Sequence, residues 1–179
     1  MALAQQQIVA SSFGASQQSI LSSVLRTLPL NVPFQVLHEP TDHAKVVLAS
    51  IKAIHDGKDA CGEFNLAMAR LHSYTQRVLK ATLQVPVGYV TFYGSLAKTV
   101  GGGPRAVGNV MANNPYAPIV PCHRVVKTDF TLGGYGFGLK AKVAILKREK
   151  RGFPNQIMVP VNGRTLDVYP VECVLRNVA

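Results

Sequence analysis

The hexapeptide Pro121-Cys122-His123-Arg124-Val125-Val126 is the stretch around which the rest of the sequence is best understood. The apolar pair Ile119-Val120 leads into it, which indicates a buried strand or turn over residues 119–126. A free cysteine is usually a small buried hydrophobe, and Cys122 could be only that. Its neighbours, however, are an imidazole and a guanidinium, and positive charge favours the thiolate, the reactive form of cysteine. The hexapeptide therefore predicts a nucleophile.

The composition indicates a folded protein of a reducing compartment. The chain has 179 residues, enough for one or two domains with a core, and its 47% of apolar residues excludes wholesale disorder. Three cysteines without a CxxC pair favour a reducing environment, although a Cys61–Cys173 disulfide stays open. No basic residue precedes Arg26, and no apolar run approaches the ~18 residues that span a bilayer. We expect a cytoplasmic protein, or a nuclear one in a eukaryote, without a membrane partner.

The positive charge of the chain is concentrated around Cys122. The net charge is +10, and the residues from 77 to 151 account for all of it, with twelve basic side chains against Asp129 and Glu149. A solvated basic surface is one explanation. Because the same segment contains Cys122, we favour a surface that binds the phosphates of a nucleic acid.

The first seventy residues carry weaker signals. Ile8-Val9, the run from Ile20 to Leu30 and the run from Phe34 to Leu37 could each be a short strand, separated by glycine and prolines. The middle run also has helical spacing, but we favour a small sheet. From Asp42 the apolar pattern predicts an amphipathic helix that Gly57 ends, followed by a connection over residues 58–72.

A helix-turn-helix precedes the cysteine. Ser73 with Gln76 forms a capping-box pattern and predicts a helix that stops before Pro86. A strand at 89–92, a helix at 93–100, a glycine turn at 101–103 and a helix from Pro104 to about residue 112 follow. The second of these two short helices carries small residues, which fit core packing and DNA docking equally well; they are Ala106, Gly108 and Ala112.

The residues after the cysteine predict a lid, a helix and a hairpin. The glycine-rich segment 133–138 is flexible enough for a lid, and a basic helix runs from Leu139 to about Glu149. Beyond residue 152 lie β-prone runs at 157–161 and 168–175, and Asn162-Gly163 is a strong turn signal.

We therefore predict a mixed α/β (α+β) chain in three parts. Residues 1–72 form a small N-terminal sheet-and-helix domain, residues 73–153 a mostly helical domain with the helix-turn-helix, and residues 154–179 an extension with a β-hairpin. We expect no metal and no cofactor, because the candidate ligands lack the spacing of a metal site. These candidates are His38, His43, His55, Cys61 and His72.

Across residues 73–152 the sequence resembles the O6-alkylguanine-DNA alkyltransferases, also called methylated-DNA–protein-cysteine methyltransferases. The resemblance rests on Tyr93, Pro104-Arg105-Ala106-Val107-Gly108, Asn114-Pro115, the hexapeptide, Gly134-Tyr135, Gly138-Leu139 and Glu149, in that order and spacing. It implies a DNA repair protein that flips O6-alkylguanine, and also O4-alkylthymine, out of duplex DNA. It further implies that each molecule, acting as a monomer without a cofactor, takes one alkyl group irreversibly onto Cys122.

The chemistry of that transfer needs a soft nucleophile and a base. A thiolate would attack the alkyl carbon, and the thioether so formed has no hydrolytic way back. Neighbours on an extended strand point to opposite faces, so we expect His123 to reach Cys122 through a bridging water. The resemblance implies that Glu149 orients His123. The alternative for Glu149 is a surface carboxylate paired with Lys147 or Arg148.

The resemblance also implies roles in binding the flipped base. Tyr93 would serve the ring nitrogen of the leaving guanine, and Asn114 would brace the turn that carries the cysteine; a core tyrosine and a plain turn-former are the alternatives. Arg105 would fill the space of the flipped nucleotide. The further expected DNA contacts are Tyr93 again, Ala106, Gly108 and Arg124, and the expected lid contacts are Gly134, Tyr135 and Gly136.

Two competing functions remain at this point. A DNA-binding lesion sensor or regulator of the same fold would not need the set of Cys122, His123 and Glu149. A cysteine hydrolase built on that set would leave the helix-turn-helix and the concentrated positive charge unexplained. We therefore favour the alkyltransferase.

Overall fold

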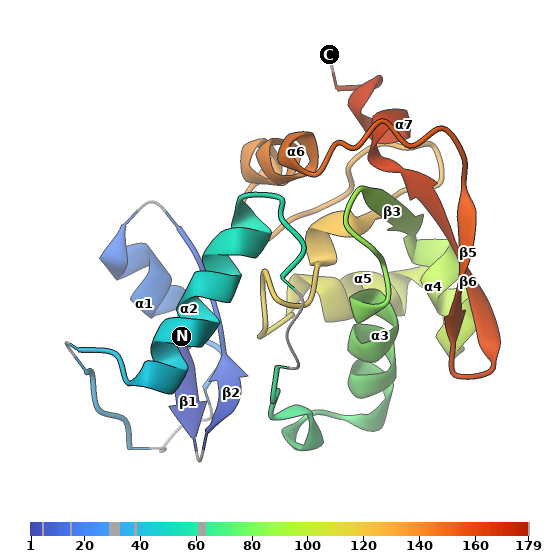
Figure 1. The fold of residues 1–179 in the computed structure, drawn as a ribbon. Coiled ribbons are helices and arrows are strands. Elements are labelled where there is room, and N and C mark those ends of the chain that lie inside the picture. Colours follow the sequence, from blue (N-terminus) through green and yellow to red (C-terminus); the bar gives the residue numbers. More distant parts are fainter. Residues whose placement is uncertain (5, 15, 29–32, 38, 61–63, 179) are drawn as a thin grey trace.

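A computed structural model describes residues 1–4, 6–14, 16–28, 33–37, 39–60 and 64–178 of the chain. The elements before residue 60 lie on one side of the molecule, and the helices and strands that surround Cys122 lie on the other (Figure 1). The mixed α/β class that the sequence predicts is confirmed. No helix within the described parts of the chain is long and apolar enough to cross a bilayer.

The N-terminal part holds one hairpin and two helices. β1 (Ala2–Ala4) pairs antiparallel with β2 (Gln7–Ala10), which confirms the strand expected at Ile8. The strand expected from Ile20 is wrong, because α1 (Gln17–Leu25) occupies that position. The Ser16 side chain accepts from the Ser19 amide in a capping box, so helical spacing and a local cap outweigh the β-propensity of the run. The described residues 33–37 form no strand, and Leu30 lies outside the described residues.

Helix α2 (Asp42–His55) confirms the predicted amphipathic helix and joins the two halves of the molecule. Thr41 caps its first turn, and Gly57 follows its end with a φ of +76°. A Cβ atom at Gly57 would lie 2.5 Å from the backbone carbon and oxygen of Arg148. Only glycine allows both this close approach and this backbone conformation. The C-terminal end of α2 therefore packs directly on the end of a distant helix.

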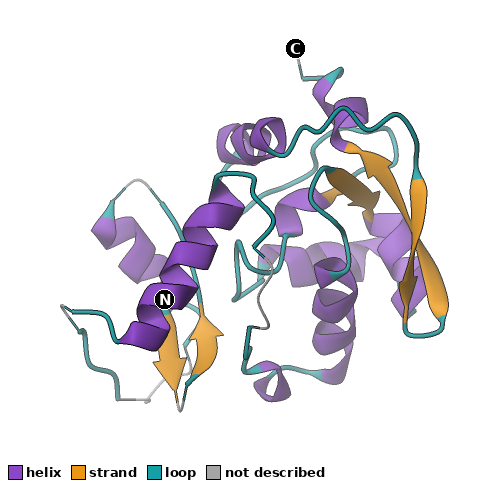
Figure 2. Cartoon of the chain, viewed as in Figure 1, coloured by secondary structure: helices purple, strands orange, loops and turns teal. Residues whose placement is uncertain are grey.

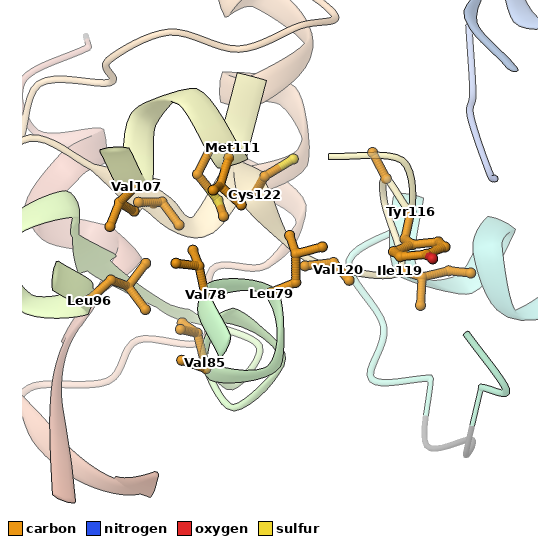
Figure 3. Packing of buried hydrophobic residues seen from close by; sticks show 14 of the residues in the cluster. Val78, Leu79, Val85, Leu96, Val107, Met111, Tyr116, Ile119, Val120 and Cys122 are labelled. Atoms are coloured by element: carbon orange, nitrogen blue, oxygen red, sulfur yellow. The ribbon is translucent and has the colours of Figure 1, made fainter. Parts of the chain in front are cut away.

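Three helices form the bundle that supports the cysteine: α3 (Ser73–Leu83), α4 (Tyr93–Val100) and α5 (Pro104–Ala112). Their buried faces share one apolar cluster, of which Val78, Leu96 and Val107 are fully buried members (Figure 3). α4, the turn at 101–103 and α5 confirm the predicted helix-turn-helix, with Pro104 in the first turn of α5.

The predicted cap of α3 is wrong. Ser73 is the first helical residue and His72 precedes it as the N-cap, without a capping hydrogen bond from its side chain. Gln76 instead donates from Nε2 to the carbonyl of Leu71, 2.8 Å away. The helix still begins at residue 73, where we place the domain boundary.

A four-stranded sheet in the order β4-β3-β6-β5 lies beside the bundle (Figure 2). β3 (Tyr89–Phe92) pairs parallel with β4 (Val125–Val126) and antiparallel with β6 (Arg164–Pro170), which in turn pairs with β5 (Ile157–Val161). The predicted hairpin is thus confirmed, but its second strand starts earlier and stops at Pro170. The residues beyond form α7 (Val171–Leu175), whose Val171 and Val174 are buried at helical spacing. The remaining helices are the short turns η1 (Met68–Arg70) and η2 (Cys122–Arg124), and α6 (Leu139–Arg148).

Candidate active site

Cys122 opens a single turn of 3-10 helix, so the buried strand or turn expected over residues 119–126 is a turn at the cysteine and a short strand after it. Its amide donates to the carbonyl of Val120 at 2.8 Å, and η2 leads directly into β4. A 3-10 helix has three residues per turn, so successive side chains point about 120° apart. Cys122, His123 and Arg124 therefore project in three different directions from one turn. The turn, rather than strand alternation, sets what each of them contacts.

The thiol of Cys122 lies in the wall of a cavity of about 730 Å³. Cys122 is only 5% exposed, and the cavity is the side from which a bound molecule can reach its sulfur. The wall combines α4, α5 and the segment that follows β4. The lining residues are Tyr93, Gly94, Pro104, Arg105, Gly108, Met111, Ala112, Cys122, Lys127, Thr128, Asp129, Gly133, Gly134, Tyr135 and Gly136.

His123 and Glu149 form a buried pair behind the cysteine. The Nε2 atom of His123 lies 2.9 Å from Oε1 of Glu149, and neither side chain is exposed. The alternative of a surface carboxylate at Glu149 is therefore wrong. Burial acts to raise the pKa of Glu149, but His123 and the Arg124 guanidinium outweigh it and lower the pKa to about 2. Glu149 is a carboxylate at neutral pH.

The pair leaves one nitrogen of His123 available as a base. Burial is the largest influence on His123 and lowers its pKa, so the imidazole is neutral at pH 7. Since the ionised Glu149 can only accept a hydrogen bond, the Nε2 atom of His123 must donate it and therefore carries the proton. Nδ1 then presents a lone pair, and it has no hydrogen-bond partner among the described residues. This is the arrangement of a base held by an orienting carboxylate.

Arg124 binds Glu149 instead of pointing to solvent. Its Nη2 lies 2.7 Å from Oε1 of Glu149, its Nε lies 3.0 Å from Oε2, and its Nη1 donates to the Val85 carbonyl at 2.7 Å. Arg124 is 6% exposed. The prediction that Arg124 contacts DNA is therefore wrong, because the guanidinium is buried and bound through both edges of its fork. Its charge instead balances the carboxylate that holds His123.

Asn114 braces the turn before the cysteine, as the sequence predicts. Its Nδ2 donates to the carbonyl of Val120 at 2.9 Å, and its Oδ1 accepts from the Tyr116 amide at 3.0 Å. The Asn114 side chain and the charge of Lys142 favour the thiolate, but burial is the largest influence and raises the pKa of the thiol. Cys122 therefore rests as a thiol and needs a base before it can react.

Lys142 is a member of the site that we did not predict. Its ammonium group donates to the carbonyls of Val125 at 2.7 Å, Gly134 at 3.3 Å and Leu132. It is completely buried, and burial lowers its pKa to about 8. The lysine ties the lid segment to β4. The sequence does hold a signal, because Lys142 lies three residues before Ile145 and four before Leu146, on the apolar face of α6.

The lid lies against Tyr93. Gly133 has a φ of +65°, and a Cβ atom there would lie 2.9 Å from the Tyr93 ring, so this residue must be small. Burial, and then the nearby Cys122, raise the pKa of Tyr93, whose hydroxyl therefore keeps its proton. Tyr135 from the lid meets the His123 ring edge-on, with centroids 6.5 Å apart. Burial also raises the pKa of Tyr135.

The outer surface of α5 is open. Arg105 is exposed near the start of the helix, Ala106 and Gly108 are half-buried, and no atom lies within 4 Å of a Cβ built at Gly108. Core packing therefore does not account for the glycine. The structure leaves a slim, accessible helix face beside the cavity that holds Cys122.

Comparisons with known proteins cover the segment that holds this site. Residues 73–151 match the family model described as the DNA-binding domain of 6-O-methylguanine DNA methyltransferase. The methylated-DNA–protein-cysteine methyltransferase of Pyrobaculum aerophilum is 52% identical over 67 residues, which are 37% of this chain and 45% of that protein. The protein of the same name from Mycobacterium tuberculosis is 46% identical over 83 residues, 45% of this chain and 50% of that protein. The chain thus spans about half the length of these curated relatives.

Solved structures extend the match towards the N-terminus. The O6-methylguanine-DNA methyltransferase of Pyrococcus kodakaraensis strain KOD1 is 30% identical, with a TM-score of 0.56 over 74% of this chain and 75% of that one. The chain belongs to the O6-methylguanine-DNA methyltransferase family. Another family member, the Mycobacterium tuberculosis OGT in complex with DNA, is 37% identical, with a TM-score of 0.53 over 59% of this chain and 66% of that one.

The family match contains the whole candidate site. Tyr93, Cys122, Lys142 and Glu149 all lie within residues 73–151. The β5–β6 hairpin and α7 follow this segment, so they are an addition to the part of the chain that the family model describes.

Proposed function

We propose that this protein repairs alkylated DNA by transferring the alkyl group of O6-alkylguanine to the sulfur of Cys122, once per molecule. One observation carries the proposal: a buried thiol lines a cavity beside a helix-turn-helix, and the next residue in the chain, His123, is paired with Glu149. The sequence match to methylated-DNA–protein-cysteine methyltransferases supports the same activity.

The reaction begins with the loss of the thiol proton. His123 accepts this proton at Nδ1 through a bridging water, and Glu149 stabilises the imidazolium through Nε2. The sulfur then attacks the alkyl carbon and forms the carbon–sulfur bond as the bond to O6 breaks. The electron pair of that bond passes to O6 and the guanine ring. The product on the protein is a thioether, which no nearby group reverses, so each molecule reacts once.

The leaving guanine takes a proton from Tyr93. Tyr93 lines the cavity with Cys122, and its raised pKa keeps the hydroxyl protonated and able to donate to the departing ring. The proton that Tyr93 gives up is replaced by the one that His123 took from the thiol, so both residues end the reaction in their starting state. Asn114 and Lys142 favour the negative charge on sulfur before the attack, which lowers the cost of forming the thiolate in a buried site.

Duplex DNA reaches this site by presenting the target base outside the helix stack. The open face of α5, with Ala106 and Gly108, is slim enough to approach the DNA closely. Arg105, exposed near the helix start, takes the space of the extruded nucleotide. An alkylated base pairs poorly, so its extrusion costs less than that of an intact one. Gly134, Tyr135 and Gly136 line the far wall and contact the flipped base.

The decisive experiment is the intact mass of the protein after incubation with duplex DNA that carries one O6-methylguanine. The expected result is one CH2 increment per molecule, absent in Cys122→Ser, and peptide mapping places it on Cys122. Tight lesion binding without a mass change would mean a sensor instead. Loss of the methyl group from DNA with repeated turnover and an unmodified protein would mean a hydrolase.

A further inference from the structure

The β5–β6 hairpin is joined to the helix-turn-helix by a shared strand. β6 pairs with β3, with Tyr89 opposite Pro170 and Val90 opposite Tyr169, and β3 runs without a break into α4. The hairpin follows the segment that the family model matches, and its Val161, Leu166 and Val168 are buried in the same apolar cluster as the helices of that segment. Figure 1 shows the hairpin lying along α4. The addition is therefore fixed to the first helix of the DNA-binding motif.

Polar contacts fix the tip of the hairpin to the C-terminal end of α4. Arg164 donates from Nη1 to the carbonyls of Lys98 and Thr99, each 3.2 Å away. The Thr99 hydroxyl donates in return to the Thr165 carbonyl at 3.0 Å. The carbonyls of Lys98 and Thr99 belong to the last turn of α4, directly before the turn at 101–103 that leads into α5. The hairpin tip therefore lies next to the turn of the helix-turn-helix.

The tip has the chemistry of a phosphate-binding surface. Asn162, Gly163, Arg164 and Thr165 are all exposed, and the φ angles of +48° and +75° at the first two make a tight two-residue turn. Among the described residues the contacts of Arg164 go through Nη1, which leaves the rest of its guanidinium on the surface.

Two lysines lie near the tip. Lys98 is exposed on α4, and Lys80 lines a shallow pocket together with Asn162. The one acidic side chain on the hairpin, Asp167, is half-buried three residues further along β6. The surface formed by Lys80, Lys98 and Arg164 is thus a cationic one.

We propose that the β5–β6 hairpin is a wing of the DNA-binding motif, whose tip binds backbone phosphates of the duplex beside the segment that α5 contacts. This inference rests on the proposed DNA-directed function. We take duplex DNA as the molecule bound at the tip for two reasons. The tip is cationic and the DNA backbone is anionic, and the hairpin is attached directly to α4 of the helix-turn-helix. Arg164 and Lys98 supply the contacts, because one is held by the α4 terminus and the other lies in the same helix turn.

The test compares undamaged duplexes of two lengths, one just covering α5 and one extending past the hairpin. Arg164→Ala is expected to weaken binding of the longer duplex about threefold to tenfold and to reduce its salt slope by about one, with the loss confined to that duplex. Thr165→Lys, which adds a cation at the exposed tip, is expected to tighten binding of the same duplex. Arg176→Ala removes an equal charge from an exposed position directly after α7 and is the matched control.

Three outcomes would overturn the wing. The first is an equal loss on both duplexes, or a loss no greater than that of Arg176→Ala. The second is a Thr165→Lys variant that binds the longer duplex no more tightly; this variant keeps the test valid if Arg164→Ala does not fold. The third is that either variant changes the sedimentation coefficient of the protein but not its DNA affinity, which would mean that the tip contacts a second copy of the chain. Because binding to undamaged DNA is measured, failure of methyl transfer to Cys122 would leave a positive result intact.

Discussion

Arg124 and Glu149 face each other edge to edge inside the protein, with Nη2 of the arginine 2.7 Å from Oε1 and Nε 3.0 Å from Oε2. The same Oε1 atom lies 2.9 Å from Nε2 of His123. One carboxylate therefore serves two partners, a permanent cation and a titrating ring. Because the arginine keeps Glu149 ionised, the imidazolium that forms when His123 takes a proton has a full negative charge beside it.

Glu149→Gln should reduce both the rate of methyl transfer and the stability of the fold. The amide cannot stabilise imidazolium at His123, and it leaves the Arg124 charge buried without its partner. Breaking such a buried pair costs roughly 3–5 kcal/mol. Urea unfolding and single-turnover rates on methylated duplex measure the two effects.

Asp59→Asn is the matched control for this change, because it removes one carboxylate from an exposed position. It should leave both quantities within error. A Glu149→Gln variant with unaltered rate would contradict the role of Glu149 in holding His123.

Lys142→Met should change how stability depends on pH. In the folded protein the pKa of Lys142 is lowered to about 8 from the ordinary value of 10.5. Between these two pH values the unfolded chain binds a proton that the folded chain has lost, so the wild type gains stability as pH rises. The gain is at most about 3 kcal/mol.

The measured quantity is the difference in unfolding free energy between wild type and Lys142→Met at a series of pH values. Both proteins also carry Cys122→Ser, because the charge of Lys142 influences the pKa of the thiol. Subtraction then removes the contributions of the tyrosines, which titrate in both proteins. The difference should grow in favour of the wild type from pH 8 to 10.5. A flat difference would mean that Lys142 keeps its proton in the fold.

Arg105→Ala should separate base extrusion from chemistry. The exposed Arg105 lies near the start of α5 on the rim of the cavity, where it can support a duplex with one nucleotide removed from the stack. Reaction with alkylated duplex should fall by an order of magnitude or more, whereas reaction with a free alkylguanine base should change little. Single-turnover rates on both substrates decide the matter, and an equal loss on both would remove the extrusion role.

Gly133→Ala should destabilise the lid. The new Cβ would overlap the Tyr93 ring at 2.9 Å, and alanine does not favour a φ of +65°. A loss of about 1–3 kcal/mol is expected from this backbone strain. Gly134→Ala is the control, because no atom lies within 4 Å of its Cβ position. Thermal unfolding of the two variants should differ clearly; equal melting temperatures would contradict the packing of Gly133 on Tyr93.

Local signals in the sequence predicted the elements that depend on local physics. Pro104 after a glycine turn marked the start of α5, and Asn162-Gly163 marked the hairpin, since both act through backbone torsions alone. The run at Ile20 was ambiguous because its apolar residues fit the spacing of a helix as well as that of a strand. The capping box at Ser16, which the sequence prediction did not consider, favours the helix.

The buried charges were harder to predict, because they depend on partners distant in sequence. Arg124 was expected at the DNA surface, yet its carboxylate partner lies 25 residues away, directly after the end of α6. Lys142 is buried because carbonyls from two other segments receive its ammonium group. The local sequence around a buried charge does not reveal which distant groups will pair with it. The apolar stripe of α6 was the available evidence, and a lysine on that stripe marks a position where the tertiary structure must supply acceptors.

Through the contact between Gly57 and the Arg148 backbone, the N-terminal part of the chain can influence the reaction at Cys122. Arg148 immediately precedes Glu149, so a side chain at position 57 would press on the peptide that aims the carboxylate at His123. A substitution in a part of the chain that contributes no group to the reaction would then change the rate at Cys122. The C-terminal end of α2 thus restricts the movement of the Arg148–Glu149 peptide, and through Glu149 it helps to fix the position of the His123 ring.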